Sequence, residues 1–131
     1  MLIARDPAGR VAILERVERR GAEPPMHLHN REDEIVYVLA GKLTYYMDKE
    51  ARTATAGTWV FLPRGMEHTF TVESDEARLL VMVAPAGLEG FYQELDGDGI
   101  DGEGDLERLV TVAARYGVEI IGPPPWHAHN R

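Results

Sequence analysis

Short apolar runs separated by turn residues fill the first two thirds of this 131-residue chain, and they limit its fold more than any other feature. Most of these runs are shorter than a typical helix and rich in β-branched and aromatic residues, as strands are. Residues 67–72 alternate, so that His68 and Phe70 share one face of the expected strand while Glu67 faces the other way. Further strands are expected at residues 11–17, 35–40, 42–47, 58–62 and 78–84. The pattern predicts an all-β antiparallel sandwich or small barrel rather than βαβ units.

The last third of the chain has a different pattern, which predicts a short helical segment. Residues 88–95 place four apolar side chains on one helix face, and residues 106–116 are expected to form a second helix with an N-cap at Asp105. Residues 96–104 are expected to be an acidic, glycine-rich loop, and residues 118–121 a further short strand. The expected apolar stripes are Leu88, Phe91, Tyr92 and Leu95 in the first helix and Leu106, Leu109, Val110 and Ala113 in the second.

The length of the chain is typical of one domain. We expect a single domain over residues 1–122, with a barrel core at about 11–85 and a helical tail at about 86–122. Residues 123–131 begin with three prolines and are expected to form a loose C-terminal tail.

Composition argues against several classes of function. The chain carries 14 Lys and Arg against 22 Asp and Glu, and this net charge of −8 argues against binding to nucleic acid or to an anionic membrane surface. The absence of cysteine excludes disulfides, thiolate nucleophiles and Fe–S clusters. The apolar runs are too short to cross a bilayer, and the N-terminus has no apolar signal-peptide region. We therefore expect a soluble, cytoplasmic protein.

Three of the five histidines are candidate metal ligands. His27 and His29 are two residues apart, so on a strand both imidazoles point to the same face. His68 lies on the expected inward face of its strand, and Glu34 opens the strand that follows the first pair. Imidazole binds Fe, Mn, Ni, Cu and Zn alike, so these four side chains meeting inside a barrel would form a transition-metal site.

The same residues match two motifs of the cupin superfamily, which the chain resembles from residue 21 to about residue 85. Val72 stands where the second motif has asparagine, a position that is not a metal ligand in the family. The resemblance implies a small double-stranded β-helix barrel in which His27, His29, Glu34 and His68 hold a divalent transition metal (Fe, Mn, Ni, Zn or Cu). The matching positions are Gly21, His27, His29, Glu34 and Gly41 in the first motif and Gly57, Pro63, Gly65 and His68 in the second.

Within the superfamily, residues 24–41 and 85–92 most resemble single-domain proteins similar to quercetin 2,3-dioxygenase. This resemblance implies a metal-dependent dioxygenase in which a small-molecule substrate chelates the metal and Glu34 acts as the catalytic base. A non-oxidative lyase or isomerase and a non-catalytic small-molecule-binding protein remain alternatives, because one barrel hosts many functions. Cupins commonly pair through their sheets, so we expect a homodimer.

Other residues are alternatives to this assignment. Glu32 or Asp33 could supply the fourth ligand instead of Glu34. His127 and His129 repeat the spacing of the first histidine pair, but they follow the triple proline and are expected to be solvated. The two inward aromatic residues, Tyr45 and Phe70, could either line a pocket or fill the core.

Overall fold

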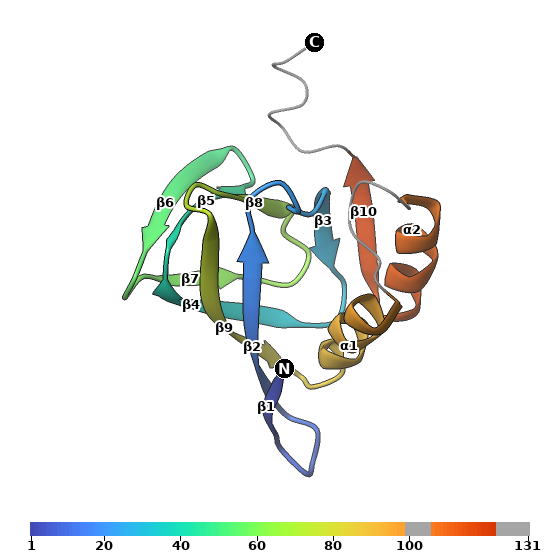
Figure 1. The fold of residues 1–131 in the computed structure, drawn as a ribbon. Helices are drawn as coiled ribbons and strands as arrows, with labels where there is room; N and C mark the ends of the chain where they lie inside the picture. Colours follow the sequence, from blue (N-terminus) through green and yellow to red (C-terminus); the bar gives the residue numbers. More distant parts are fainter. Residues whose placement is uncertain (99–105, 123–131) are drawn as a thin grey trace.

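The structure is a computed structural model that describes residues 1–98 and 106–122 (Figure 1). The expected loop after residue 98, the expected cap at Asp105, and the tail with His127 and His129 lie outside the described residues. Ten strands and two helices are present in the described part. The strands are β1 (Leu2–Arg5), β2 (Ala12–Arg19), β3 (Met26–His29), β4 (Asp33–Ala40), β5 (Lys42–Met47), β6 (Glu50–Thr55), β7 (Trp59–Leu62), β8 (His68–Val72), β9 (Glu76–Ala84) and β10 (Val118–Gly122), and the helices are α1 (Leu88–Asp98) and α2 (Leu106–Arg115).

Two five-stranded antiparallel sheets form the barrel of a double-stranded β-helix (Figure 1). The first sheet has the strand order β1-β2-β9-β4-β7, and the second has the order β10-β3-β8-β5-β6. Strands that are neighbours in a sheet are often far apart in the sequence; β9, for example, lies between β2 and β4. The all-β class predicted from the strand spacing is confirmed, and the two helices follow the barrel strands as expected.

The core lies between the two sheets. In β4 the inward residues Glu34, Val36 and Val38 are buried, whereas the outward Tyr37 and Leu39 are partly or largely exposed. This strand is apolar on both faces, and the sequence suggested that both faces would be buried. Only one face is buried, because the outer side of the first sheet is not covered by another layer of the described chain.

A tight turn at Gly41 joins β4 in the first sheet to β5 in the second. Its φ of 92° is in the region that favours glycine. A Cβ at this position would lie 2.6 Å from the carbonyl oxygen of Glu76 and 2.8 Å from the Cα of Ala77. The glycine predicted to end this strand is therefore required both by its backbone conformation and by the close approach of β9.

The C-terminal segment contributes a strand to the barrel. After α2, β10 pairs with β3, which carries the first two histidines, in an antiparallel register. The further short strand expected at residues 118–121 is therefore confirmed. Two further strands, β1 and β6, were not predicted; β6 is mostly exposed and has few apolar residues to mark it.

The helices differ from the prediction in two details. Asp96 lies within α1 rather than in a loop, because the helix continues to residue 98. In α2 the buried residues include Val112 instead of the expected Leu106 and Val110, which are 52% and 44% exposed. The buried face is therefore rotated relative to the predicted stripe. Neither described helix combines the length and the apolar character that a membrane crossing requires.

Candidate metal centre

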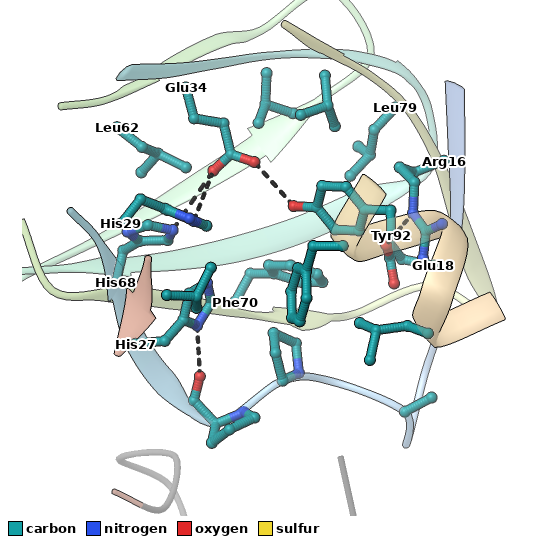
Figure 2. A pocket seen from close by; sticks show the side chains of 18 of the residues that line it. Arg16, Glu18, His27, His29, Glu34, Leu62, His68, Phe70, Leu79 and Tyr92 are labelled. Atoms are coloured by element: carbon teal, nitrogen blue, oxygen red, sulfur yellow. Dashed lines mark hydrogen bonds and ion pairs between the residues drawn. The ribbon is translucent and has the colours of Figure 1, made fainter. Parts of the chain in front are cut away.

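The histidines come from two adjacent strands of the second sheet, and the glutamate comes from the opposite sheet. His27 and His29 lie on β3, and His68 is the first residue of β8, directly opposite His27 in the strand register. Glu34 lies on β4 in the first sheet and is buried. The structure therefore brings together all four residues that the sequence singled out, as Figure 2 shows.

The donor atoms of the three imidazoles converge on one point. One ring nitrogen from each of His27, His29 and His68 lies within 4.8 Å of the others. The Glu34 carboxylate joins them, because its Oε2 lies 3.7 Å from Nε2 of His29 and 3.5 Å from Nε2 of His68. This is a donor set of three imidazoles and one carboxylate, which suits a divalent transition metal.

Two of the imidazoles are oriented by the backbone. The Nδ1 of His27 lies 2.8 Å from the carbonyl oxygen of Pro25, and the Nδ1 of His68 lies 3.0 Å from that of Met66. A carbonyl oxygen can only accept a hydrogen bond, so each Nδ1 must carry the proton. The Nε2 of each ring is then left with a free lone pair, as in metal-binding histidines held by a carbonyl group.

His29 gives an independent test of whether the residues present fit a metal. Its side chain is 2% exposed, and neither ring nitrogen has a hydrogen-bond partner within residues 1–98 and 106–122. Leaving a buried polar group unsatisfied costs roughly 1–3 kcal/mol. A metal ion bound by a ring nitrogen would offset this cost, so the donor set fits the group that the resemblance implies.

The protonation states of the site also suit a metal. Burial and, to a smaller extent, the neighbouring imidazoles lower the pKa of His27 to about 3. Burial also lowers the pKa of His29, although the Glu34 carboxylate acts in the opposite direction. For Glu34, burial raises the pKa, but the adjacent imidazoles, that of His68 first, outweigh it and bring the value to about 2. Near neutral pH these two rings are neutral and the carboxylate is ionised, as ligands must be.

Glu34, and not either of its acidic neighbours, faces the imidazoles. Asp33 turns toward the loop after β7, where its Oδ1 accepts a hydrogen bond from the backbone N–H of Arg64 at 2.9 Å. Glu32 is buried, but in the described part of the chain no ion pair joins it to the histidines, and its Oε2 has no hydrogen-bond partner. The alternatives of Glu32 or Asp33 as the carboxylate beside the histidines are therefore not supported.

A cavity of about 270 Å³ extends from the histidines through the barrel interior. Its end nearest α1 is polar, and it contains Arg16, Glu18 and Tyr92 (Figure 2). No local sequence pattern predicted a role for these polar residues; Tyr92 was expected only as part of an apolar helix face. Between the two ends the walls are mostly apolar, formed in part by Tyr45, Leu62, Phe70, Leu79, Phe91 and Leu95.

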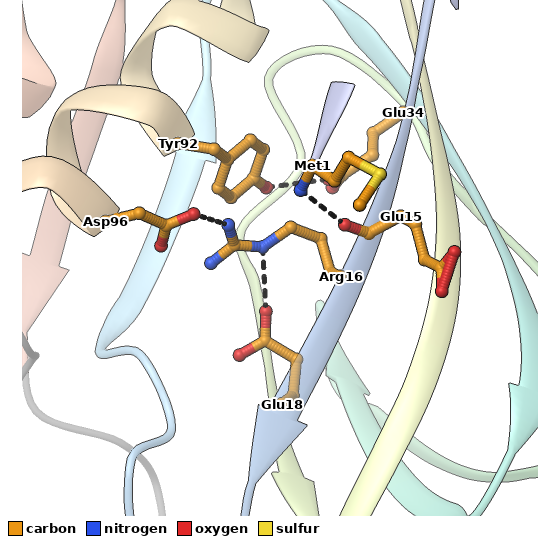
Figure 3. A network of polar contacts seen from close by, with 7 residues as sticks. All are labelled: Met1, Glu15, Arg16, Glu18, Glu34, Tyr92 and Asp96. Atoms are coloured by element: carbon orange, nitrogen blue, oxygen red, sulfur yellow. Dashed lines mark hydrogen bonds and ion pairs between the residues drawn. The ribbon is translucent and has the colours of Figure 1, made fainter. Parts of the chain in front are cut away.

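Arg16 links strand β2 to helix α1 at the polar end of the cavity (Figure 3). Its Nε donates to Glu18 on the same strand at 3.3 Å, and its Nη1 donates to Asp96 on the helix at 2.6 Å. The guanidinium also lies over the ring of Tyr92, 4.7 Å from its centroid. Burial raises the pKa of Glu18, and the Arg16 charge opposes that rise.

Tyr92 connects this polar end to the histidines. Its hydroxyl donates a hydrogen bond of 3.1 Å to Oε1 of Glu34. Burial and the negative charge of Glu34 keep the pKa of Tyr92 well above 10, so its hydroxyl remains protonated. The sequence could have shown only that Tyr92 lies on the inward face of a helix, not that it reaches a carboxylate on β4.

The fold and the site define a cupin. The family model for the cupin domain matches residues 13–84, more than half of the chain, and the chain belongs to this family. Among curated proteins, residues of this chain are 27% identical to quercetin 2,3-dioxygenase of Bacillus subtilis (strain 168) over 73 residues, which are 56% of this chain and 22% of that protein. The chain spans at most half of the length of the curated relatives it matches.

Solved structures share the same fold. KdgF from Halomonas sp. is 21% identical, with a TM-score of 0.63 over 69% of this chain and 80% of that chain. The DMSP lyase DddQ from Ruegeria pomeroyi DSS-3 is 26% identical, with a TM-score of 0.53 over 58% of this chain and 39% of that chain. The first of these likenesses shows the fold alone.

Proposed function

We propose that this cupin is a metal-dependent enzyme that binds a small molecule at a divalent transition metal held by His27, His29, His68 and Glu34. The observation that carries the proposal is the convergence of the four side chains on one point inside the barrel. One of them, His29, is buried, and neither of its ring nitrogens has a hydrogen-bond partner among the described residues. The metal, when bound, would supply Lewis acidity and, if it is redox-active, electron transfer.

The residues of the chain would bind the substrate and move its proton. Glu34 is the proposed base, accepting a proton from a substrate hydroxyl at Oε2, the oxygen that faces the imidazoles. The apolar walls around Phe70 and Leu79 would exclude water from the reacting group. The cavity of about 270 Å³ is just below the usual range for drug-sized ligands, so it favours a small substrate.

The reaction we favour is a dioxygenase reaction on a small phenolic or enolisable compound. Its support is the likeness to quercetin 2,3-dioxygenase together with the group of three histidines and the glutamate that lies beside two of them. The test is oxygen uptake by Fe-, Mn- or Ni-loaded protein with a panel of flavonols and diketones. Uptake that requires both metal and substrate, and that falls at least a hundredfold in Glu34→Gln, supports the proposal. No uptake with any metal and substrate in the panel would count against it.

A non-oxidative lyase or isomerase reaction is the second candidate. The hydrogen bond from Tyr92 to Glu34 places a proton donor beside a proposed proton acceptor, and such a pair needs no oxidant. The likeness to a protein described as a DMSP lyase points the same way. This candidate predicts turnover in the absence of oxygen. Saturable binding of a compound that is recovered unchanged, aerobically and anaerobically, would instead indicate a binding protein without catalysis.

The metal itself is tested separately from turnover. Protein purified without chelators is expected to contain close to one equivalent of a first-row metal by elemental analysis. Treatment with a chelator should remove it, and titration with Fe, Mn, Ni, Zn or Cu salts should restore it. Protein that neither contains nor binds any of these metals would overturn the proposed site, whatever its activity.

A further inference from the structure

The Glu34 carboxylate has different partners at its two oxygens. Oε2 faces Nε2 of His29 and His68 at 3.7 and 3.5 Å, whereas Oε1 accepts the hydrogen bond of the Tyr92 hydroxyl at 3.1 Å (Figure 2). An ionised carboxylate only accepts hydrogen bonds, so the tyrosine hydroxyl must be the donor. A bond to one oxygen alone restricts rotation of the carboxylate about its last side-chain bond.

Tyr92 comes from outside the segment that matches the family model. That match ends at residue 84, and Tyr92 lies in the second turn of α1, which begins at Leu88. The two cupin motifs therefore do not include this contact. The contact depends on how helix α1 is placed against the barrel.

We propose that Tyr92 is a positioning residue that holds Oε1 of Glu34, so that the carboxylate presents Oε2 alone to the metal. This inference rests on the proposed metal site. Hydrogen-bonded neighbours of metal ligands typically contribute 10- to 100-fold to metal affinity, because they hold the ligand in its binding orientation. The same range is expected here for the Tyr92 hydroxyl.

The position of Tyr92 is itself fixed by a second set of contacts. The Arg16 guanidinium lies 4.7 Å from the centre of the tyrosine ring and is bonded to Asp96, one helical turn further along α1. Arg16 is also bonded to Glu18 on β2, so the ring is held between the helix and the strand. Phenylalanine at position 92 would keep the ring and its contact with Arg16 and remove only the hydroxyl. Tyr92→Phe is therefore the informative change.

The experiment measures the affinity of chelator-treated protein for Ni²⁺ and Zn²⁺ by calorimetry. We expect Tyr92→Phe to bind each metal 10- to 100-fold more weakly than the natural sequence. Tyr116→Phe is the matched control, because the Tyr116 hydroxyl also bonds a carboxylate, that of Glu94 on α1, but lies away from the histidines. This control should change the affinity by less than twofold.

A double-mutant cycle separates positioning of the carboxylate from a general effect on the fold. In the Glu34→Ala background three imidazoles remain to bind metal, and the Tyr92 hydroxyl has no carboxylate to hold. Tyr92→Phe should then have less than a twofold effect on affinity. An equal loss in both backgrounds would mean that the substitution disturbs the barrel, and it would overturn the positioning role.

The visible spectrum of bound Co²⁺ gives a readout that does not depend on affinity or activity. At saturating Co²⁺, Tyr92→Phe should change the position or intensity of the ligand-field bands, because the carboxylate oxygens would bind differently, whereas Tyr116→Phe should leave them unchanged. If the natural sequence binds none of the three metals, the proposed metal site fails. If it binds them and Tyr92→Phe matches it in affinity and spectrum, only the role of Tyr92 fails.

Discussion

His27 and His68 face each other as a directly opposed pair in the antiparallel strands β3 and β8, with ring centroids 4.5 Å apart. Each ring is held by a carbonyl group two residues before it in the sequence. The contacts that orient these two imidazoles therefore come from the protein itself. It follows that the two rings are pre-oriented before a metal arrives, and we expect the barrel to fold without the metal.

Replacement of one imidazole should therefore remove metal without unfolding the barrel. We expect His68→Ala to lower bound metal at least tenfold, because one of the converging ligands is lost, while the circular dichroism spectrum of the metal-free protein stays unchanged. Elemental analysis after dialysis measures the metal. His127→Ala, which lies outside the described residues, is the control and should change neither quantity. Full metal content in His68→Ala would show that the metal binds elsewhere.

Glu32 should make the stability of the metal-free protein depend on pH. Its pKa is raised from 4.5 to about 6, mainly by burial and with smaller contributions from the charges of Glu34 and Glu89, while Arg31 opposes the rise. The folded state thus holds the proton more tightly than the unfolded chain, and its stability falls as the pH rises from about 4.5 through 6. At about 1.4 kcal/mol per pKa unit, the loss above pH 6 is about 2 kcal/mol.

Glu32→Gln should abolish this part of the pH dependence. In urea unfolding with a chelator present, the variant and the natural sequence should differ little at pH 4, and the variant should be more stable by about 2 kcal/mol at pH 8. Both proteins share all the other titratable groups, so the contribution of those groups to the pH dependence of stability cancels in the comparison. A variant that is less stable at pH 8 would show that the ionised Glu32 has a favourable partner.

Of the two residues that join β2 to α1, Arg16 should contribute more to the free energy of unfolding than Asp96. Asp96 is a largely exposed partner, so Asp96→Asn should cost less than about 1 kcal/mol of unfolding free energy. Arg16 is mostly buried, and Arg16→Met would leave the Glu18 carboxylate without its partner, which costs roughly 1–3 kcal/mol. Urea unfolding of the two variants measures both values. Equal losses, or a larger loss for Asp96→Asn, would contradict this order.

We propose that the protein is a homodimer. β7 is an edge strand of the first sheet, and its outward-facing side chains, Trp59 and Phe61, are 65% and 56% exposed. Edge strands with exposed apolar side chains are commonly covered by another chain. Light scattering at micromolar concentration should give twice the mass of one chain, and Trp59→Lys should shift it toward the monomer. A monomeric mass for the natural sequence would refute the proposal.

The metal centre could be predicted because each of its residues lies on a strand with a recognisable pattern. The two-residue spacing of His27 and His29 and the alternation around His68 set which way these side chains point, and the spacing of the motifs identified Glu34. The structure places all four together. Metal binding by these four residues stays a prediction, which elemental analysis tests.

The polar end of the cavity could not be predicted from local patterns. Arg16 and Tyr92 are 76 positions apart in the sequence, and their contact depends on how α1 docks against β2. Helical periodicity placed Tyr92 on an apolar face, but it could not show that the hydroxyl reaches Glu34. Likewise β6 has mainly exposed residues, and its pairing with β5 rather than its own composition makes it a strand.

Strand β10 pairs with β3 so that Ile120 lies opposite His27 and Val118 lies opposite His29. The backbone that carries both imidazoles is therefore braced on one side by β8 and on the other by the final strand of the described chain. Shortening the protein to its family-matched segment would turn β3 into a free edge and loosen half of the ligand set. A minimal version of this metal centre must consequently retain the chain as far as residue 122.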